Sequence, residues 1–227
     1  MLKNIKFGLI AFICMGSSFV ALAQKTIKSG TITYAVEFQL PPDQQAMAAM
    51  LPSEYKVAFD GEMSKFKLDM GMFSTQVIYN AGTNESLSLT EVPIQSKKIA
   101  VKMTSDQTNQ MQEMQSGEKD FEVKATSETK KIGVYNCTKY ILTDKISGDK
   151  TEVWTTNEIT IPKNSLTTMV KDVKGFPVAF ESSSNGMKVK MNLKQVKEEE
   201  VPAITFDVPS DYEVLSFDSM LQMMGGR

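Results

Sequence analysis

The chain alternates apolar and polar residues with a period of two along most of its length, and this pattern constrains the fold more than any other feature. One segment places Ile32, Tyr34, Val36 and Phe38 at every second position, with polar or small residues between them. Such alternation is typical of a β-strand that has one face in the core. The runs are joined by turns such as Asp60-Gly61, which are too short for the helical crossovers that parallel strands need. The pattern therefore predicts an antiparallel sheet of about ten strands.

Four segments interrupt the alternation, and short helices are expected in them. They are residues 42–51, 105–115, about 165–172 and about 214–224. A sheet of about ten strands curls, and antiparallel sheets usually bury one face and leave the other wet. We therefore predict a mainly β (α+β) fold. It is a single strongly curved antiparallel sheet, a half-barrel, with a few short helices covering its concave face.

The N-terminus has the features of a secretory signal peptide. Lys3 and Lys6 precede an apolar stretch over residues 7–20, and Ala21-Leu22-Ala23 fits the small-x-small cleavage pattern. We predict a cleaved signal at 1–23, one domain over 24–227 and no transmembrane segment in the mature chain. An uncleaved anchor is the alternative. The expected location is the periplasm or the outer membrane of a Gram-negative bacterium.

A lipoprotein signal is a second alternative, because Cys14 lies within the apolar stretch. A lipidated cysteine needs a small residue directly before it, and the bulky Ile13 argues against that modification. Cleavage after Ala23 would remove Cys14 and leave Cys137 as the single thiol, so that no intramolecular disulfide can form.

The composition removes most of the side chains on which enzymes rely. The chain has no histidine and a single arginine, Arg227. This excludes Ser-His-Asp triads and HExxH metal sites, and it removes the usual bidentate ligand of phosphate and carboxylate groups. The formal net charge of −2 gives no basic surface for nucleic acid. We predict a non-enzymatic protein with no cofactor, and a hydrolase that uses paired carboxylates is the least favoured alternative.

Methionine is unusually frequent, with 16 residues in the chain. Most lie in close sets, which are Met47 with Met50, Met70 with Met72, Met111 with Met114, and Met220 with Met223 and Met224. Thioethers are soft ligands that suit Cu(I), so a copper site is an alternative. Methionine also packs adaptably against variable apolar ligands. We predict apolar lining or lid material and no metal.

The candidate ligand-binding residues are the apolar side chains expected on the concave face, together with methionines of the helical segments. They are Tyr34, Val36, Phe38, Met47, Met50, Tyr55, Val57, Phe59, Phe66, Leu68, Met70, Met111, Met114, Trp154, Met187, Val189 and Met191.

Several short motifs resemble a known family. Residues 130–140 (KKIGVYNCTKY) fit a K-I-x-G-Y-x-C-x-K-Y pattern, Trp154-Thr155-Thr156 fits its W-y-T strand, and residues 206–212 (FDVPSDY) fit an F-x-x-P-x-G-Y ending. Over about residues 30–212 the chain thus resembles an uncharacterised family of exported Bacteroidetes-type proteins, a domain of unknown function. That family is similar to the LolA/LolB/LppX-like periplasmic carriers. Val134 after Gly133, and Asp211 in place of glycine, depart from the pattern.

The resemblance implies a curved half-barrel with helical lid elements and an apolar cavity, which the carriers use for acyl chains. We predict a periplasmic or envelope protein that binds a lipid, an acyl group, a lipoprotein or another apolar ligand in that cavity. The alternative is a structural or interaction module of the envelope with a protein partner. A Met-based Cu(I)-binding protein is the third hypothesis.

Overall fold

The computed structural model describes residues 24–116, 121–146, 148–164, 170, 173–184 and 187–225. The predicted signal peptide, residues 1–23, and most of the helix predicted at 165–172 lie outside these ranges. The elements in chain order are β1 (Lys25–Thr26), β2 (Ser29–Gln39), the 3-10 helix η1 (Pro42–Met50), β3 (Glu54–Asp60), β4 (Met63–Asp69), β5 (Ser74–Asn80), β6 (Glu85–Val92), η2 (Pro93–Gln95), β7 (Lys97–Met103), α1 (Ser105–Ser116), β8 (Phe121–Ile132), β9 (Tyr135–Asp144), β10 (Lys150–Thr156), β11 (Ile159–Thr160), β12 (Phe176–Ser184), β13 (Met187–Glu198), β14 (Glu213–Val214) and α2 (Phe217–Gly225).

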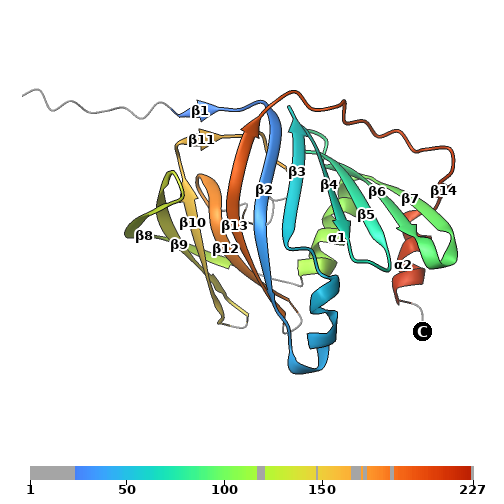
Figure 1. Ribbon diagram of the computed structural model, residues 1–227, viewed down its shortest axis with the longest axis horizontal. Helices are drawn as coiled ribbons and strands as arrows, with labels where there is room; N and C mark the ends of the chain where they lie inside the picture. The colour runs from blue at the N-terminus through green and yellow to red at the C-terminus, as the bar shows by residue number, and fades with distance from the viewer. Residues whose placement is uncertain are drawn as a thin grey trace, which may run out of the picture.

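One large sheet dominates the structure (Figure 1). Its twelve strands follow the order β14-β7-β6-β5-β4-β3-β2-β13-β12-β10-β9-β8, and β1 and β11 form a separate parallel pair. The pairs within the large sheet are antiparallel except β14 with β7, which is parallel. The prediction of a mainly β, mainly antiparallel fold is confirmed, but the sheet has twelve strands where about ten were expected. One of them, β14, has two residues, too few to leave an alternating pattern in the sequence.

The strand register defines two faces of the sheet. Ile32, Val57, Phe66, Val77 and Val101 follow one another in register across β2, β3, β4, β5 and β7, with Ser88 of β6 in the same row. The side chains of one row share a face, because a strand points successive side chains to opposite sides. Helices α1 and α2 cover this face over β6 and β7, where Met111 and Phe217 pack against Val101. We call this side the helix face.

The helix predicted at 105–115 is confirmed as α1, and the sequence explains where it starts. The backbone N–H of Gln107 donates to Thr104 Oγ1 at 3.4 Å, and the N–H of Thr104 donates to Gln107 Oε1 at 3.0 Å. This reciprocal capping box satisfies two donors that the first turn leaves without a partner. The helix predicted at 214–224 begins later, at Phe217, because Val214 pairs with β7 in β14.

The opposite face is not wet throughout, and in this respect the prediction was wrong. After β13 the chain continues as an extended segment, residues 199–212, which we call the strap. Its Ile204 packs with Ile78, Leu87 and Ala100, and Leu87 and Ala100 are fully buried. A second apolar core thus lies between the strap and the far face of β5, β6 and β7. In Figure 1 the strap runs past the upper end of these strands towards β14.

The end of the strap is anchored by polar contacts to β6 and β7. Tyr212 donates its hydroxyl to Glu91 Oε1 at 2.7 Å, and Lys98 Nζ lies 2.8 Å from Asp211 Oδ2. Burial, together with the hydrogen bond to Glu91, raises the pKa of Tyr212 to about 12. The hydrogen bond from Lys98 lowers the pKa of Asp211, so that its carboxylate stays charged at neutral pH. The anchor also places β14 beside β7, so that this edge of the sheet is covered.

Ser64 on β4 offers a direct test of the packing on the helix face. Its side chain is 1% exposed, and among the described residues its hydroxyl is the one buried side-chain oxygen without a hydrogen-bond partner. An unsatisfied buried hydroxyl destabilises the fold, so we expect Ser64→Ala to raise the free energy of unfolding by up to about 1 kcal/mol. Urea denaturation measures the change.

Ser86→Ala is the matched control for that substitution. Ser86 lies on the same face of β6, but its hydroxyl bonds with the Thr108 hydroxyl of α1 at 2.8 Å. We expect Ser86→Ala to lower stability by about 1 kcal/mol, because it breaks this bond and leaves Thr108 without it. Equal losses of stability in the two variants would contradict the conclusion that the Ser64 hydroxyl has no hydrogen-bond partner.

Candidate functional site

Burial on the helix face of β2, β3 and β4 decreases from one end of these strands to the other. On β2, Ile32 and Tyr34 are fully buried, Val36 is 7% exposed and Phe38 is half-buried. On β3 the order is reversed, with half-buried Tyr55 at the start of the strand and fully buried Phe59 near its end. Because β2 and β3 are antiparallel, both strands lose burial towards the same end.

β4 follows the same trend, from buried Ser64 to half-buried Phe66 and Leu68. The helix face is therefore packed at one end and less covered at the other. We call the second the open end; it is the end where η1 and the β4–β5 turn lie, at the bottom of the sheet in Figure 1.

Five half-buried apolar side chains lie on the helix face towards the open end, and we call them the apolar strip; they are Phe38, Tyr55, Phe66, Leu68 and Val189. Phe38 lies directly opposite Val189 in the β2–β13 register. The rings of Tyr55 and Phe66 lie with their centroids 5.1 Å apart. Burial raises the pKa of the Tyr55 hydroxyl, so this group stays neutral. The strip thus offers apolar and aromatic surface and no charged group.

Tyr34 lies directly opposite Tyr55 of the strip in the β2–β3 register. Its side chain is fully buried, its hydroxyl donates to the backbone oxygen of Pro177 at 2.6 Å, and its ring meets Phe180 edge-on at 5.9 Å between centroids. This contact ties β2 to β12 across the intervening β13. Tyr34 therefore belongs to the core and not to the strip.

The predicted site residues fall into distinct groups. The register brings together on the helix face Tyr34, Val36, Phe38, Tyr55, Val57, Phe59, Phe66, Leu68, Val189 and Met191. Of these, Tyr34, Val36, Val57, Phe59 and Met191 are buried and fill the core, and the other five are the apolar strip. The side chains of Met47 and Met187 lie outside what the structure describes.

Trp154 is buried in the same core cluster as Tyr34 and Phe59, but the strand register places it on the other face of the sheet. It pairs with Lys139 and Ala179, which continue in register to Asn192 and Ala35, whereas Val153 pairs with Phe180 on the helix face. Trp154 therefore lies on the far face. There Lys130 Nζ lies 3.9 Å from the centroid of its ring, in a cation–π contact.

The predicted methionines separate into a core group and an exposed group. Met111 of α1 packs with Met103 of β7 and with Phe217 and Met220 of α2 in the core between the helices and the sheet. Met50 and Met114 are 39% and 54% exposed, and Met70 is half-buried directly after β4. Within the described ranges no group of three or more histidine, cysteine, aspartate or glutamate side chains is placed to hold a metal.

Cys137, the thiol expected in the mature chain, is 1% exposed. Burial raises the pKa of this thiol, and its Sγ lies 3.6 Å from the backbone oxygen of Tyr135. A raised pKa leaves little thiolate at neutral pH, and the thiolate is the reactive form. The geometry is that of a core residue.

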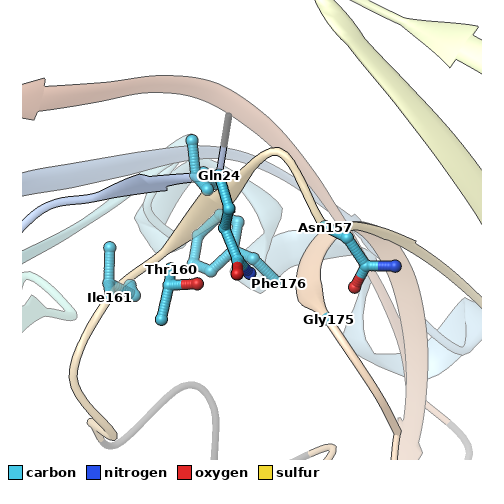
Figure 2. Close-up of a pocket in the computed structure, with 7 residues that line it drawn as sticks. Gln24, Asn157, Thr160, Ile161, Gly175 and Phe176 are labelled. Atoms are coloured by element: carbon cyan, nitrogen blue, oxygen red, sulfur yellow. The ribbon is translucent and has the colours of Figure 1, made fainter. Parts of the chain in front are cut away.

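A separate small pocket lies beside the β1–β11 pair, where no site residue was predicted. It has a volume of about 230 Å³ and is lined by Gln24, Asn157, Ile159, Thr160, Ile161, Gly175 and Phe176 (Figure 2). Pockets that enclose drug-sized ligands usually have about 300–1,000 Å³ and mostly apolar walls. This pocket is smaller and carries amide and hydroxyl groups. It therefore suits an acyl chain less well than the apolar strip does.

One glycine could have pointed to this pocket. Gly175 has a φ of +89°, and a Cβ at this position would lie 2.8 Å from the Thr156 oxygen and 2.9 Å from Asn157 Oδ1. The Gly175-Phe176-Pro177 triplet thus marks a tight approach of two chain segments at the pocket wall.

Within the described ranges no helix is long and apolar enough to cross a bilayer.

Comparison with known proteins adds a family of unknown function. Residues 161–212 match the model of a domain of unknown function, DUF4412, and this match runs through β12 and β13 to the end of the strap. No curated protein matches the chain. Similar solved structures include PNGF-II in space group P21, with 15% identity and a TM-score of 0.48, and PNGF-II in space group C2, with 15% identity and a TM-score of 0.45.

These two matches cover 88% and 86% of this chain but 33% and 32% of the PNGF-II chains. The chain therefore spans about a third of the length of those structures.

Proposed function

We propose that this is a non-enzymatic protein of the cell envelope that binds an apolar ligand, a lipid or an acyl group, against the open end of its helix face. The observation that carries the proposal is the loss of burial towards one end of β2, β3 and β4, which leaves the apolar strip half-buried. The free energy falls when a bound ligand removes half-buried aromatic and aliphatic side chains from water, and this favours binding.

The shape expected for such a protein is the curved half-barrel of the LolA-like carriers, with α1 and α2 as lid elements. Support comes from a single mainly antiparallel sheet that carries both α-helices on one face. Export to the periplasm or the outer membrane is part of the proposal and rests on the predicted signal at 1–23. The absence of histidine and the buried state of Cys137 favour binding over catalysis.

Titration with a dansyl-labelled fatty acid tests the proposal. We expect saturable binding with a blue shift in the dansyl emission, because the probe moves to an apolar site. Phe66→Ser removes a ring from the middle of the strip and should weaken binding about tenfold, since a buried Phe contributes about 1.5–3 kcal/mol. Leu68→Ser is a second, smaller truncation in case Phe66→Ser impairs folding, which urea denaturation monitors.

Val134→Ser is the matched control for both substitutions. Val134 is 73% exposed in the turn between β8 and β9, at the opposite end of the sheet from the strip. This variant should bind the probe with unchanged affinity. The proposal is wrong if the unmodified protein shows no saturable binding, or if the strip variants bind as tightly as the Val134→Ser protein.

An interaction module of the envelope is the second candidate, and one observation favours it. β8 is the last strand in the sheet order and pairs, within the described residues, only with β9. A twelve-residue edge strand can pair with an extended segment of a partner protein. Val123→Pro on this strand would then abolish partner binding while leaving fatty-acid binding intact, because proline removes a backbone donor from the strand.

A further inference from the structure

Eight of the ten exposed large apolar side chains of the described chain lie at one end of the molecule, and the other two are Val134 and Val214. Met50 lies at the end of η1, Met72 and Phe73 lie in the β4–β5 turn, Met114 is near the end of α1, and Met223 and Met224 are near the end of α2. We call these six side chains the rim. Figure 1 shows η1, the β4–β5 turn and the C-terminal ends of α1 and α2 at the open end of the sheet.

The same end carries two more exposed apolar side chains. Ile94 is 82% exposed in the β6–β7 turn, which adjoins the β4–β5 turn because Ser74 pairs with Glu91. Ile146 is exposed in the β9–β10 turn, at the same end as the start of β13. By contrast, Val134 projects from the other end. Exposed apolar side chains concentrated at one end of a protein are typical of an interaction surface.

The rim continues directly from the apolar strip. Leu68 of the strip is two residues before Met70, and Met72 and Phe73 follow in the turn. Met50 packs onto this turn, since its Cε lies 3.5 Å from where a Cβ on Gly71 would be. A ligand that reaches the strip from the open end therefore passes the rim. This link makes the rim part of the proposed function, and the inference rests on that function.

Three backbone donors of the β4–β5 turn have partners within the turn. The N–H of Met70 donates to the Phe73 oxygen at 2.9 Å, the N–H of Met72 to the Met70 oxygen at 2.8 Å, and the N–H of Gly71 to Asp69 Oδ1 at 3.0 Å. Backbone donors without partners are costly in lipid, and these three are satisfied within the turn. The turn can thus expose Met72, 50% accessible, and Phe73, 36% accessible, without that cost.

The charges at this end favour a neutral lipid surface over an anionic one. Charged side chains of both signs lie at the open end. The cations include Lys97, Lys145, Lys150 and Lys188, and the anions include Asp69, Glu113 and Asp149. A polybasic cluster of the kind that draws proteins to anionic lipids is not formed by these residues. The rim side chains project from turns and helix ends.

We propose that the rim docks the protein on the surface of a lipid bilayer, with Met72 and Phe73 inserted among the headgroups, so that an acyl chain passes from the bilayer to the apolar strip.

Flotation with large unilamellar vesicles of phosphatidylcholine tests this docking. We expect the unmodified protein to float with the vesicles, and the fraction bound to be insensitive to salt and to added phosphatidylglycerol. The double substitution Met72→Ser with Phe73→Ser should lower the partition coefficient about tenfold, because it removes two side chains that lose water contact on insertion. Val134→Ser, at the opposite end, should leave vesicle binding unchanged.

Three results would overturn the docking proposal. They are an unmodified protein that does not float, a rim variant that floats as well as the Val134→Ser control, and flotation that requires phosphatidylglycerol and disappears in salt. If the rim variant instead abolishes a dimer seen by size-exclusion chromatography, the rim is an interface between copies of the chain.

The dansyl fatty-acid titration separates this inference from the proposed function. We expect the rim double variant to bind the fatty acid as the unmodified protein does, because the strip is intact. Fatty-acid binding without vesicle binding overturns the docking alone, and vesicle binding without fatty-acid binding overturns the proposed function alone.

Discussion

Replacing Gly30 with alanine should lower the free energy of unfolding by about 3 kcal/mol or more, because the new Cβ has no space on β2. Gly30 pairs with Glu198 on β13 and with Phe59 on β3, so it lies between two strands in the middle of the sheet. A Cβ built on Gly30 would overlap the backbone oxygen of Lys197 and would lie 3.2 Å from the Glu198 Cα. These are backbone atoms, so relief requires β2 and β13 to separate.

Gly133→Ala is the matched control, because it separates overlap from backbone strain. Gly133 has a φ of +58° in the β8–β9 turn, and a Cβ there would meet nothing within 4 Å. Alanine at this position carries only the cost of a left-handed conformation, about 1–2 kcal/mol. Urea denaturation of both variants gives the comparison. A loss in Gly30→Ala no larger than that in Gly133→Ala would show that the β2–β13 pairing yields easily.

The local pattern of the sequence was sufficient for the long strands and for α1. Period-two alternation from Ile32 to Phe38 identified β2, and its apolar positions lie on one face as expected. The segment Thr104 to Gln107 has the spacing of a capping box, and the helix starts there. Both features depend on interactions between residues close in the chain, which a sequence displays directly.

Trp154 shows why the face of a strand is harder to predict. Alternation on β10 separates Val153 from Trp154, but it does not say which of them points to the helix face. That choice is made by the partners: Val153 pairs with Phe180 and Trp154 with Lys139. Both partners lie on other strands, so residues on β10 alone do not contain the answer. On the far face Trp154 contacts Lys130, whose Nζ lies 3.9 Å from the ring centroid, and the sequence of β10 gives no sign of that partner.

The sequence predicted which face of the sheet each residue of the apolar strip occupies, but it did not predict which of these residues stay half-buried. Phe38, Tyr55, Phe66, Leu68 and Val189 were all expected on one face, and the register places them there. Their difference from Tyr34 and Val57, which share that face, is one of burial. Burial at each position depends on what packs across from it, and this is set by tertiary structure. The open end of the face is therefore a result of the structure alone.

The strap escaped prediction because its apolar residues follow no regular period. Val201, Ile204, Phe206 and Val208 are separated by prolines and polar residues, and the segment pairs with no strand until β14. Its partners, Ile78 and Leu87, lie more than a hundred residues earlier in the chain. A segment that gains its structure from such distant contacts carries no local signal. The effect of the strap on stability is nonetheless large, and it leads to a second prediction.

Ile204→Asp should lower the free energy of unfolding by about 3 kcal/mol. Ile204 is 8% exposed and packs against Ile78, Leu87 and Ala100. Truncation of a buried isoleucine costs about 2–5 kcal/mol, and an unpaired carboxylate adds the cost of desolvation. The loss is limited because the strap can detach locally and hydrate the charge, and that detachment exposes Leu87 and Leu89. We therefore expect increased binding of the dye ANS together with the fall in stability measured by urea.

Ala203→Asp is the control, because Ala203 is the exposed neighbour of Ile204 on the same strap. It introduces the same charge without removing a buried side chain, so its effect should stay within about 0.5 kcal/mol. The anchor at Tyr212 and Asp211 holds the end of the strap in both variants, so the two proteins differ only at the apolar contact. If Ile204→Asp unfolds at the same urea concentration as Ala203→Asp, the strap does not cover the far face in solution and β5 to β7 must be protected by another partner.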